Sequence, residues 1–195
     1  MQTQLDQKFL EFDLVNLRSS CPQLIIDMPY AKTDNFIKKQ VYSKPHAYLL
    51  AAAASGLQGV IQSLENKGFK LVLWDAYRPF SVQEIFWQNC PDENFLSQPV
   101  RSGGKLTSGS NHSKGAAVDV TLADSAGDYL DMPSGFDEFS ERAHSHLKLA
   151  SAKQRDHALI LKEAMENNGF KGIKYEWWHF NWHESTDLPF IDIAL

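Results

Sequence analysis

The segment around His112 combines a potential metal ligand with a carboxylate in an apolar run. A polar, glycine-containing stretch, 110–115, leads into an apolar run, 116–122, which places Asp119 between Val118 and Val120. An unpaired charge buried in such a run costs several kcal/mol. Asp119 therefore needs either a cation, which a metal ion bound together with His112 would supply, or strong donors such as the backbone amides of a neighbouring loop.

A second cluster places Glu176 and His179 inside an aromatic run, 175–182. A regular strand would put His179 on one face and Glu176 on the other, so both side chains reach one cavity only if a bulge or turn precedes the strand. If they do, His112, Asp119 and His179 make a set of two histidines and one carboxylate. Such a set suits Zn²⁺ with a fourth position open to water, and Glu176 would be free to act as a base.

The other five histidines have no acidic or cysteine partner at a spacing typical of metal ligands. A lone histidine is usually a surface residue or a hydrogen-bonded core residue rather than a ligand. The sequence therefore assigns no role to His46, His144, His146, His157 and His183.

Together these motifs resemble a known family, the zinc D-alanyl-D-alanine dipeptidases of the VanX type. The resemblance rests on Ser110-x-His112-x-x-Gly115-x-Ala117-x-Asp119 and, about sixty residues later, on Glu176-x-x-His179. It extends to Asp75-Ala76-Tyr77-Arg78-Pro79, to Tyr30-Ala31-x-x-x-Asn35-Phe36 and to Phe136-Asp137, and so covers most of residues 25–182. The wider clan includes D,D-carboxypeptidases and proteins with the hedgehog-like fold.

The resemblance implies a role for each residue of the two clusters and for one arginine. It makes His112, Asp119 and His179 the ligands of one Zn²⁺ per chain, and Glu176 the catalytic base. It also makes Arg78 the group that stabilises the transition state, where the amide oxygen gains charge. The residues alone favour a different interpretation of Arg78, as a surface ion-pair partner before a proline.

The resemblance also implies how both ends of a small dipeptide would be recognised. Asp137, with Tyr30 nearby, would bind the free ammonium, and Ser110 would donate to the free carboxylate. Without the resemblance, Asp137 and Tyr30 would be ordinary turn and packing residues. Recognition of both termini limits the length of the substrate, which separates a dipeptidase from a carboxypeptidase that acts on longer cell-wall peptides.

The elements that must position these residues follow from apolar periodicity and turn signals. We expect helices over 46–67, 81–89 and 153–168, the second starting with a capping box of Ser81 and Glu84. We expect strands over 69–74, 116–122 and 173–182, a possible hairpin turn at 124–128, and a surface loop over 99–113. This irregular order predicts an α+β fold, a single domain over 1–195 with a mostly antiparallel central sheet flanked by helices.

Composition narrows the classes of partner. The 195 residues carry a formal net charge of −5, which makes nucleic acid an unfavourable partner. No apolar stretch reaches the roughly 18 residues of a membrane span, and residues 1–17 lack the apolar core of a signal peptide, so we expect a cytoplasmic protein. Cys21 and Cys90 fit reduced thiols there, or one disulfide in an oxidising compartment.

Three functions remain in competition at this stage. The first is a zinc dipeptidase that hydrolyses D-alanyl-D-alanine to two D-alanines. The second is a D,D-carboxypeptidase or related peptidoglycan peptidase on the same fold. The third is a zinc-stabilised binding module without catalysis, which would need neither a free base such as Glu176 nor an oxyanion partner such as Arg78.

Overall fold

The computed structural model describes residues 3–195, which form an α+β structure around one five-stranded sheet. The helices are α1 (Gln4–Leu10), α2 (Leu17–Ser20), α3 (Ala51–Glu65), α4 (Phe80–Asn89) and α5 (Ala152–Glu166), with 3-10 turns η1 (Pro29–Ala31), η2 (Asn111–Lys114) and η3 (Glu141–Ala143). The strands are β1 (Leu14–Asn16), β2 (Ile25–Ile26), β3 (Tyr48–Leu50), β4 (Lys70–Asp75), β5 (Val100–Ser102), β6 (Lys105–Ser108), β7 (Ala117–Ala123), β8 (Phe170–Gly172) and β9 (His179–Trp182).

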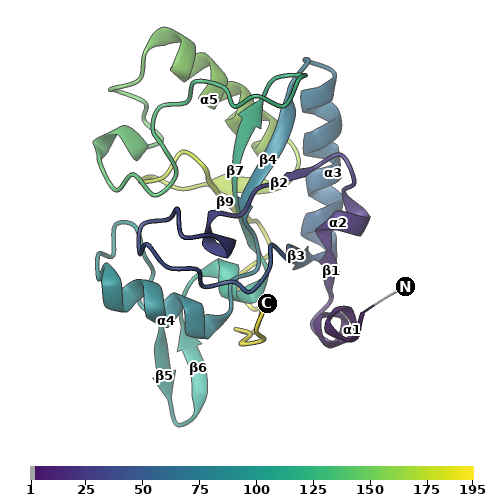
Figure 1. Cartoon of the computed structure of the whole chain (residues 1–195), viewed down its shortest axis with the longest axis vertical. Coiled ribbons are helices and arrows are strands. Elements are labelled where there is room, and N and C mark those ends of the chain that lie inside the picture. Colours follow the sequence, from purple (N-terminus) through teal and green to yellow (C-terminus); the bar gives the residue numbers. More distant parts are fainter. Residues whose placement is uncertain (1–2) are drawn as a thin grey trace.

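The central sheet has the strand order β2-β4-β7-β9-β8. Only the β2–β4 pair is parallel, and the other three pairs are antiparallel. Figure 1 shows β4 and β7 at the centre of the molecule, with α3 on one side and α4 beside the β5–β6 hairpin, which projects from the body. The predicted class, α+β with a mostly antiparallel sheet flanked by helices, is confirmed.

The two faces of the sheet have different tasks. Along β7, Val118, Val120 and Leu122 alternate with Asp119 and Thr121, so that one face is wholly apolar and the other carries polar groups. The apolar face belongs to a core that includes α3 and α5, and these two helices also contact each other. The polar face carries Asp119, the candidate metal ligand of this strand.

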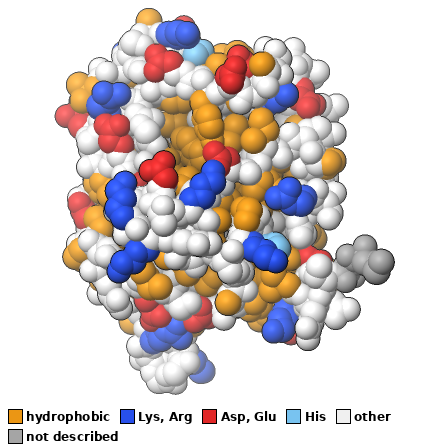
Figure 2. All heavy atoms as spheres, in the orientation of Figure 1, with side chains coloured by type: hydrophobic (Ala, Val, Ile, Leu, Met, Phe, Trp, Pro, Cys, Tyr) orange, Lys and Arg blue, Asp and Glu red, His pale blue; other side chains and the backbone are white. Residues whose placement is uncertain are grey.

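Acidic and basic side chains are interspersed on the surface face drawn in Figure 2, which therefore presents no extended basic patch. Among residues 3–195, no helix combines the length and apolar character needed to cross a membrane.

Several predicted boundaries need correction because segments distant in the chain supply backbone partners. The helix expected from residue 46 begins at Ala51, since Tyr48–Leu50 pairs with β1 as strand β3. The expected loop at 99–113 contains the β5–β6 hairpin, whose turn Gly103 and Gly104 form with φ of 56° and 78°. The strand expected over 173–182 is also shorter, because 173–178 is irregular, with two bends, and β9 begins only at His179.

The predicted capping box at the start of α4 is wrong. The helix begins at Phe80, and the backbone N–H of Ser81 donates to the Asp192 carboxylate at 2.8 Å instead. Glu84 pairs with Arg101 rather than with its own helix start. Cys21 and Cys90 are free thiols, so the alternative of a disulfide is excluded.

Candidate active site

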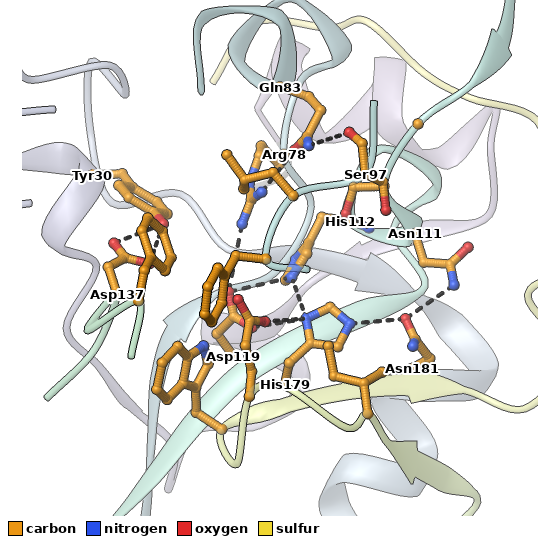
Figure 3. Close-up of a pocket in the computed structure, with 18 residues that line it drawn as sticks. Tyr30, Arg78, Gln83, Ser97, Asn111, His112, Asp119, Asp137, His179 and Asn181 are labelled. Atoms are coloured by element: carbon orange, nitrogen blue, oxygen red, sulfur yellow. Dashed lines mark hydrogen bonds and ion pairs between the residues drawn. The ribbon is translucent and has the colours of Figure 1, made fainter. Parts of the chain in front are cut away.

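The site is built where β7 and β9 run side by side on the polar face of the sheet. Asp119 of β7 and His179 of β9 are direct partners in the antiparallel register, so their side chains emerge on the same face. His112 comes from the η2 turn that precedes β7 and is 1% exposed. The structure thus brings together the three side chains that the sequence groups as metal ligands (Figure 3).

The three side chains present their donor atoms to one point. His112 Nε2 lies 3.2 Å from His179 Nδ1 and 3.3 Å from Asp119 Oδ2, and His179 Nδ1 lies 3.0 Å from Asp119 Oδ1. Zinc bonds to nitrogen and oxygen of about 2.0–2.2 Å place the ligand atoms of a tetrahedron roughly 3.3–3.6 Å apart. The spacing of the three side chains is therefore close to that of a tetrahedral metal site with one position left open.

Hydrogen bonds behind both imidazoles determine which nitrogen faces that point. His112 Nδ1 donates to the carbonyl of Ala76 at 2.6 Å, and His179 Nε2 donates to Asn181 Oδ1 at 3.0 Å. In the neutral rings, His112 Nε2 and His179 Nδ1 are then lone-pair acceptors that face each other and a carboxylate. Three acceptors repel one another unless a cation lies between them, so this donor set fits Zn²⁺.

Asp119 tolerates burial only with positive charge beside it. Burial raises the pKa of this carboxyl, whereas positive charge on the adjacent His112 and His179 outweighs burial and holds the pKa below its usual range. Where both rings are neutral, a bound cation would supply that charge. No backbone amide in residues 3–195 donates to Asp119, so the alternative of a loop-bound carboxylate is wrong. Asp119 is an ionised carboxylate that requires a cationic neighbour.

Glu176 reaches the same cavity because it lies outside the strand. It lies in the irregular segment 173–178, between two bends and just before β9, and its Oε2 lies 3.8 Å from His179 Nδ1. This turn at the strand entry is the condition that the sequence left open. Burial, followed by the charges of Asp119 and Asp137, raises the pKa of Glu176 well above its ordinary value, as expected of a carboxyl poised to take up a proton.

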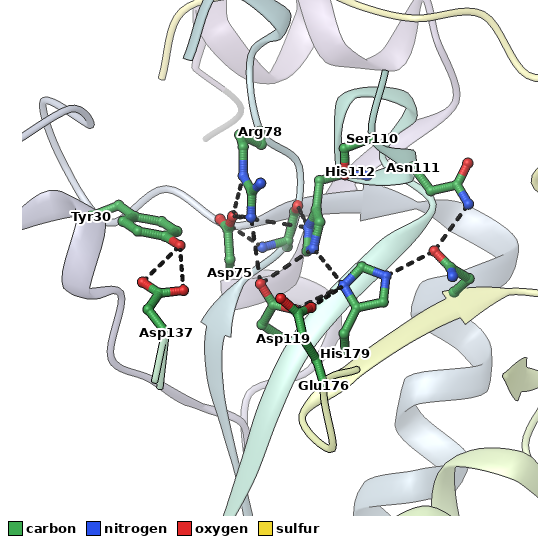
Figure 4. Close-up of polar contacts among 12 residues, drawn as sticks. Tyr30, Asp75, Arg78, Ser110, Asn111, His112, Asp119, Asp137, Glu176 and His179 are labelled. Atoms are coloured by element: carbon green, nitrogen blue, oxygen red, sulfur yellow. Dashed lines mark hydrogen bonds and ion pairs between the residues drawn. The ribbon is translucent and has the colours of Figure 1, made fainter. Parts of the chain in front are cut away.

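Arg78 is a buried residue of the cavity and not the surface ion-pair partner that the residues alone favour. It is 4% exposed, and its guanidinium donates to Asp75 Oδ2 at 2.9 Å and to Gln83 Oε1 at 2.8 Å. Its Nη2 lies 3.5 Å from Asp119 Oδ2. A buried, oriented guanidinium beside the ligand cluster is suited to stabilise negative charge that develops in the cavity (Figure 4).

Asp137 and Tyr30 form a pair at the edge of the cavity. The Tyr30 hydroxyl lies 3.0 Å from both carboxylate oxygens of Asp137. Asp137 has a φ of 55°, a left-handed conformation that is unusual outside glycine. Burial, and next the charge of Asp119, raise the pKa of Asp137 to about 8.

Ser110 lies in the same cavity with its hydroxyl proton available. Its Oγ accepts from the backbone N–H of His112 at 3.3 Å, which leaves the hydroxyl hydrogen free to donate. The cavity measures about 150 Å³ and is lined by every residue that the sequence selects, namely Tyr30, Arg78, Ser110, His112, Asp119, Asp137, Glu176 and His179.

Sequence reasoning gave no role to the residues that support the site from behind, although Asp75 belongs to one of the motifs that carry the resemblance. Asp75 has no exposed surface, and it accepts from Tyr42, from Arg78 and from the N–H of Ala76. Burial raises the pKa of Asp75, against the opposing effect of the Arg78 charge. From the residues alone, the one signal for Asp75 is that this carboxylate directly follows the apolar run 69–74. Gln83 and Asn181 have no comparable signal in the sequence.

Comparisons with known proteins show the family of the chain. A family profile described as D-ala-D-ala dipeptidase matches residues 10–192. The chain is 39% identical over 180 residues to a D-alanyl-D-alanine dipeptidase of Escherichia coli K12, covering 92% of this chain and 89% of that protein. It is also similar to proteins of the same name from Enterococcus faecalis, with 31% identity over 85% of this chain and 88% of that protein. It is 32% identical to a D-alanyl-D-alanine dipeptidase of Enterococcus faecium, covering 79% of this chain and 83% of that protein.

Proposed function

We propose that this chain, which belongs to the D-alanyl-D-alanine dipeptidase family of peptidases, hydrolyses D-alanyl-D-alanine to two D-alanines with one Zn²⁺ held by His112, Asp119 and His179. The observation that supports this proposal most strongly is the convergence of three acceptor atoms, 3.0–3.3 Å apart, on one point of a small cavity. A zinc ion there would lower the pKa of a water and polarise the amide carbonyl of the substrate.

The side chains around the ligands would carry the proton and the charge. Glu176 is the general base: its raised pKa lets its carboxylate take a proton from water and pass it to the departing amine. Arg78 would donate to the amide oxygen as that oxygen gains charge, and Asp75 and Gln83 keep its guanidinium oriented. Each of these groups is positioned before the reaction, so little reorganisation is needed.

The two ends of the cavity would select a dipeptide. Asp137, hydrogen-bonded to Tyr30, would pair with the free ammonium, and the free hydroxyl hydrogen of Ser110 would donate to the free carboxylate. We propose a small dipeptide as the substrate and the cytoplasm as the site of action. The free thiols of Cys21 and Cys90 are consistent with such a reducing compartment.

Hydrolysis of three dipeptides, D-Ala-D-Ala, N-acetyl-D-Ala-D-Ala and L-Ala-L-Ala, tests this function. Acetylation deletes the charge that Asp137 requires, and the loss of several kcal/mol corresponds to about a thousandfold in kcat/KM. We expect efficient cleavage of D-Ala-D-Ala only, because inverted centres misalign the amide. Equal rates on the free and acetylated dipeptides would instead favour a D,D-carboxypeptidase, and zinc binding without any hydrolysis would favour a non-catalytic module.

A further inference from the structure

Asn181 lies behind the ligand cluster and contacts one of its members directly. It is two residues beyond His179 on β9, so both side chains emerge on the same face of the sheet. Its Oδ1 accepts from His179 Nε2 at 3.0 Å and from Asn111 Nδ2 at 3.0 Å (Figure 3). One amide oxygen thus receives two hydrogen bonds, one from a candidate ligand and one from the η2 turn.

The two bonds together determine the form of the His179 ring. A neutral imidazole carries one N–H, and the acceptor at Nε2 keeps that hydrogen on Nε2. The lone pair is then on Nδ1, which faces Asp119 at 3.0 Å. Asn111 matters because its donor group requires the oxygen, not the nitrogen, of the Asn181 amide to point toward it.

The Asn111–Asn181 bond also joins the two segments that carry the histidines. Asn111 immediately precedes His112 in the η2 turn, and Asn181 follows His179 in β9. Both asparagines are partly buried and line the cavity. A single amide–amide contact therefore constrains the separation of the two imidazoles.

We propose that Asn181 is a positioning residue that sets the zinc affinity of the site by holding His179 with Nδ1 directed at the metal, and that Asn111 holds Asn181 in that orientation. This inference rests on the proposed zinc site. Groups that orient a metal-binding histidine in this way typically contribute 10–100-fold in metal affinity.

The test measures the zinc dissociation constant of four variants by competition with a chromophoric chelator. We expect Asn181→Leu, which keeps a similar volume but removes the acceptor, to weaken zinc binding by about 10–100-fold. Asn181→Asp keeps an acceptor for both donors and should bind zinc at least as tightly as the wild type. Asn111→Ala should cause a smaller loss, and the exposed control Asn89→Leu should cause none.

Melting of the metal-free variants separates positioning from folding. We expect metal-free Asn181→Asp to melt within a few degrees of the metal-free wild type, so that its affinity reports on the site alone. Wild-type affinity in Asn181→Leu, or an equal loss in Asn181→Asp and Asn181→Leu, would overturn the role of Asn181. Absence of zinc binding by the wild type would overturn the proposed zinc site as well, which distinguishes the two failures.

Discussion

Each candidate ligand is held from behind by a group that is not itself a ligand. Ala76 supports His112, Asn181 supports His179, and Arg78 lies 3.5 Å from Asp119. These contacts orient the ligand atoms before any ion arrives, which reduces the reorganisation that binding requires. The types and order of the ligands are visible in the sequence, but the supporting contacts join residues up to 41 positions apart and only the fold reveals them.

We expect a substitution at Glu176 to lower turnover without changing zinc binding. Glu176→Gln should keep zinc at one equivalent per chain, because the three ligands are unchanged, while kcat falls by about 10²–10⁴-fold through loss of the base. Zinc content and D-Ala-D-Ala turnover measured on the same sample check this. The exposed control Glu163→Gln should match the wild type in both; a Glu176→Gln variant with normal kcat would remove the residue from the mechanism.

The carboxyl of Asp137 should make the metal-free protein less stable as the pH rises. Its pKa of about 8 exceeds the ordinary value of 3.8, so the folded state binds the extra proton between these limits. Stability then falls with increasing pH across pH 4–8, because the folded form holds more protons than the unfolded form. Asp137→Asn can still accept from Tyr30 but does not titrate.

We therefore expect the melting temperature of Asp137→Asn, relative to the wild type, to rise between pH 4 and pH 8 when both proteins are metal-free. Thermal melts in matched buffers measure this difference. A difference independent of pH would show that Asp137 has an ordinary pKa.

At the scale of the elements, the tight passage from η2 into β7 depends on Gly115. Its φ is +66°, and a Cβ there would lie 2.6 Å from Cδ2 of Leu14, which is 1% exposed and has no room to move. Gly115→Ala should therefore add this clash to a backbone cost of about 1–2 kcal/mol. Because the strain lies three residues from His112, zinc affinity should fall as well.

Gly103→Ala is the matched control for this prediction. Gly103 has a φ of +56° but no heavy atom within 4 Å of an added Cβ, so only the backbone cost applies. At about 2–4 °C per kcal/mol for a chain of this size, Gly115→Ala should melt clearly below Gly103→Ala. Equal melting temperatures would show that the contact with Leu14 has no effect.

The elements found from the sequence are those whose own residues determine them. α3, α5, β4 and β7 show apolar periodicity or a continuous apolar run. The predicted bounds of α5, β4 and β7 agree with the structure to within two residues, whereas α3 begins five residues later than predicted. β3 and the cap of α4 were missed because their partners, β1 and Asp192, are far along the chain. The β5–β6 hairpin had a local signal, Gly103-Gly104, between strands too polar to be recognised.

At the scale of the whole molecule, the cavity draws on segments from Tyr30 to Asn181. Its formation therefore requires the folded chain, and a metal that binds only the folded form adds to the free energy of unfolding. The proposed recognition of dipeptide ends by Asp137 and Ser110 also depends on this assembly, because Ser110 precedes β7 and Asp137 follows it, and the fold brings both to one cavity. We therefore expect one bound metal ion per chain.

Titration of the metal-free protein with Zn²⁺, with D-Ala-D-Ala hydrolysis measured at each step, tests this central claim most directly. We predict no turnover without metal, a linear rise, and a plateau at one equivalent of zinc per chain. Asp119→Ala should show no such plateau, because one of the three ligands is lost. Full turnover by the metal-free wild type, or a normal plateau in Asp119→Ala, would contradict a zinc site formed by His112, Asp119 and His179.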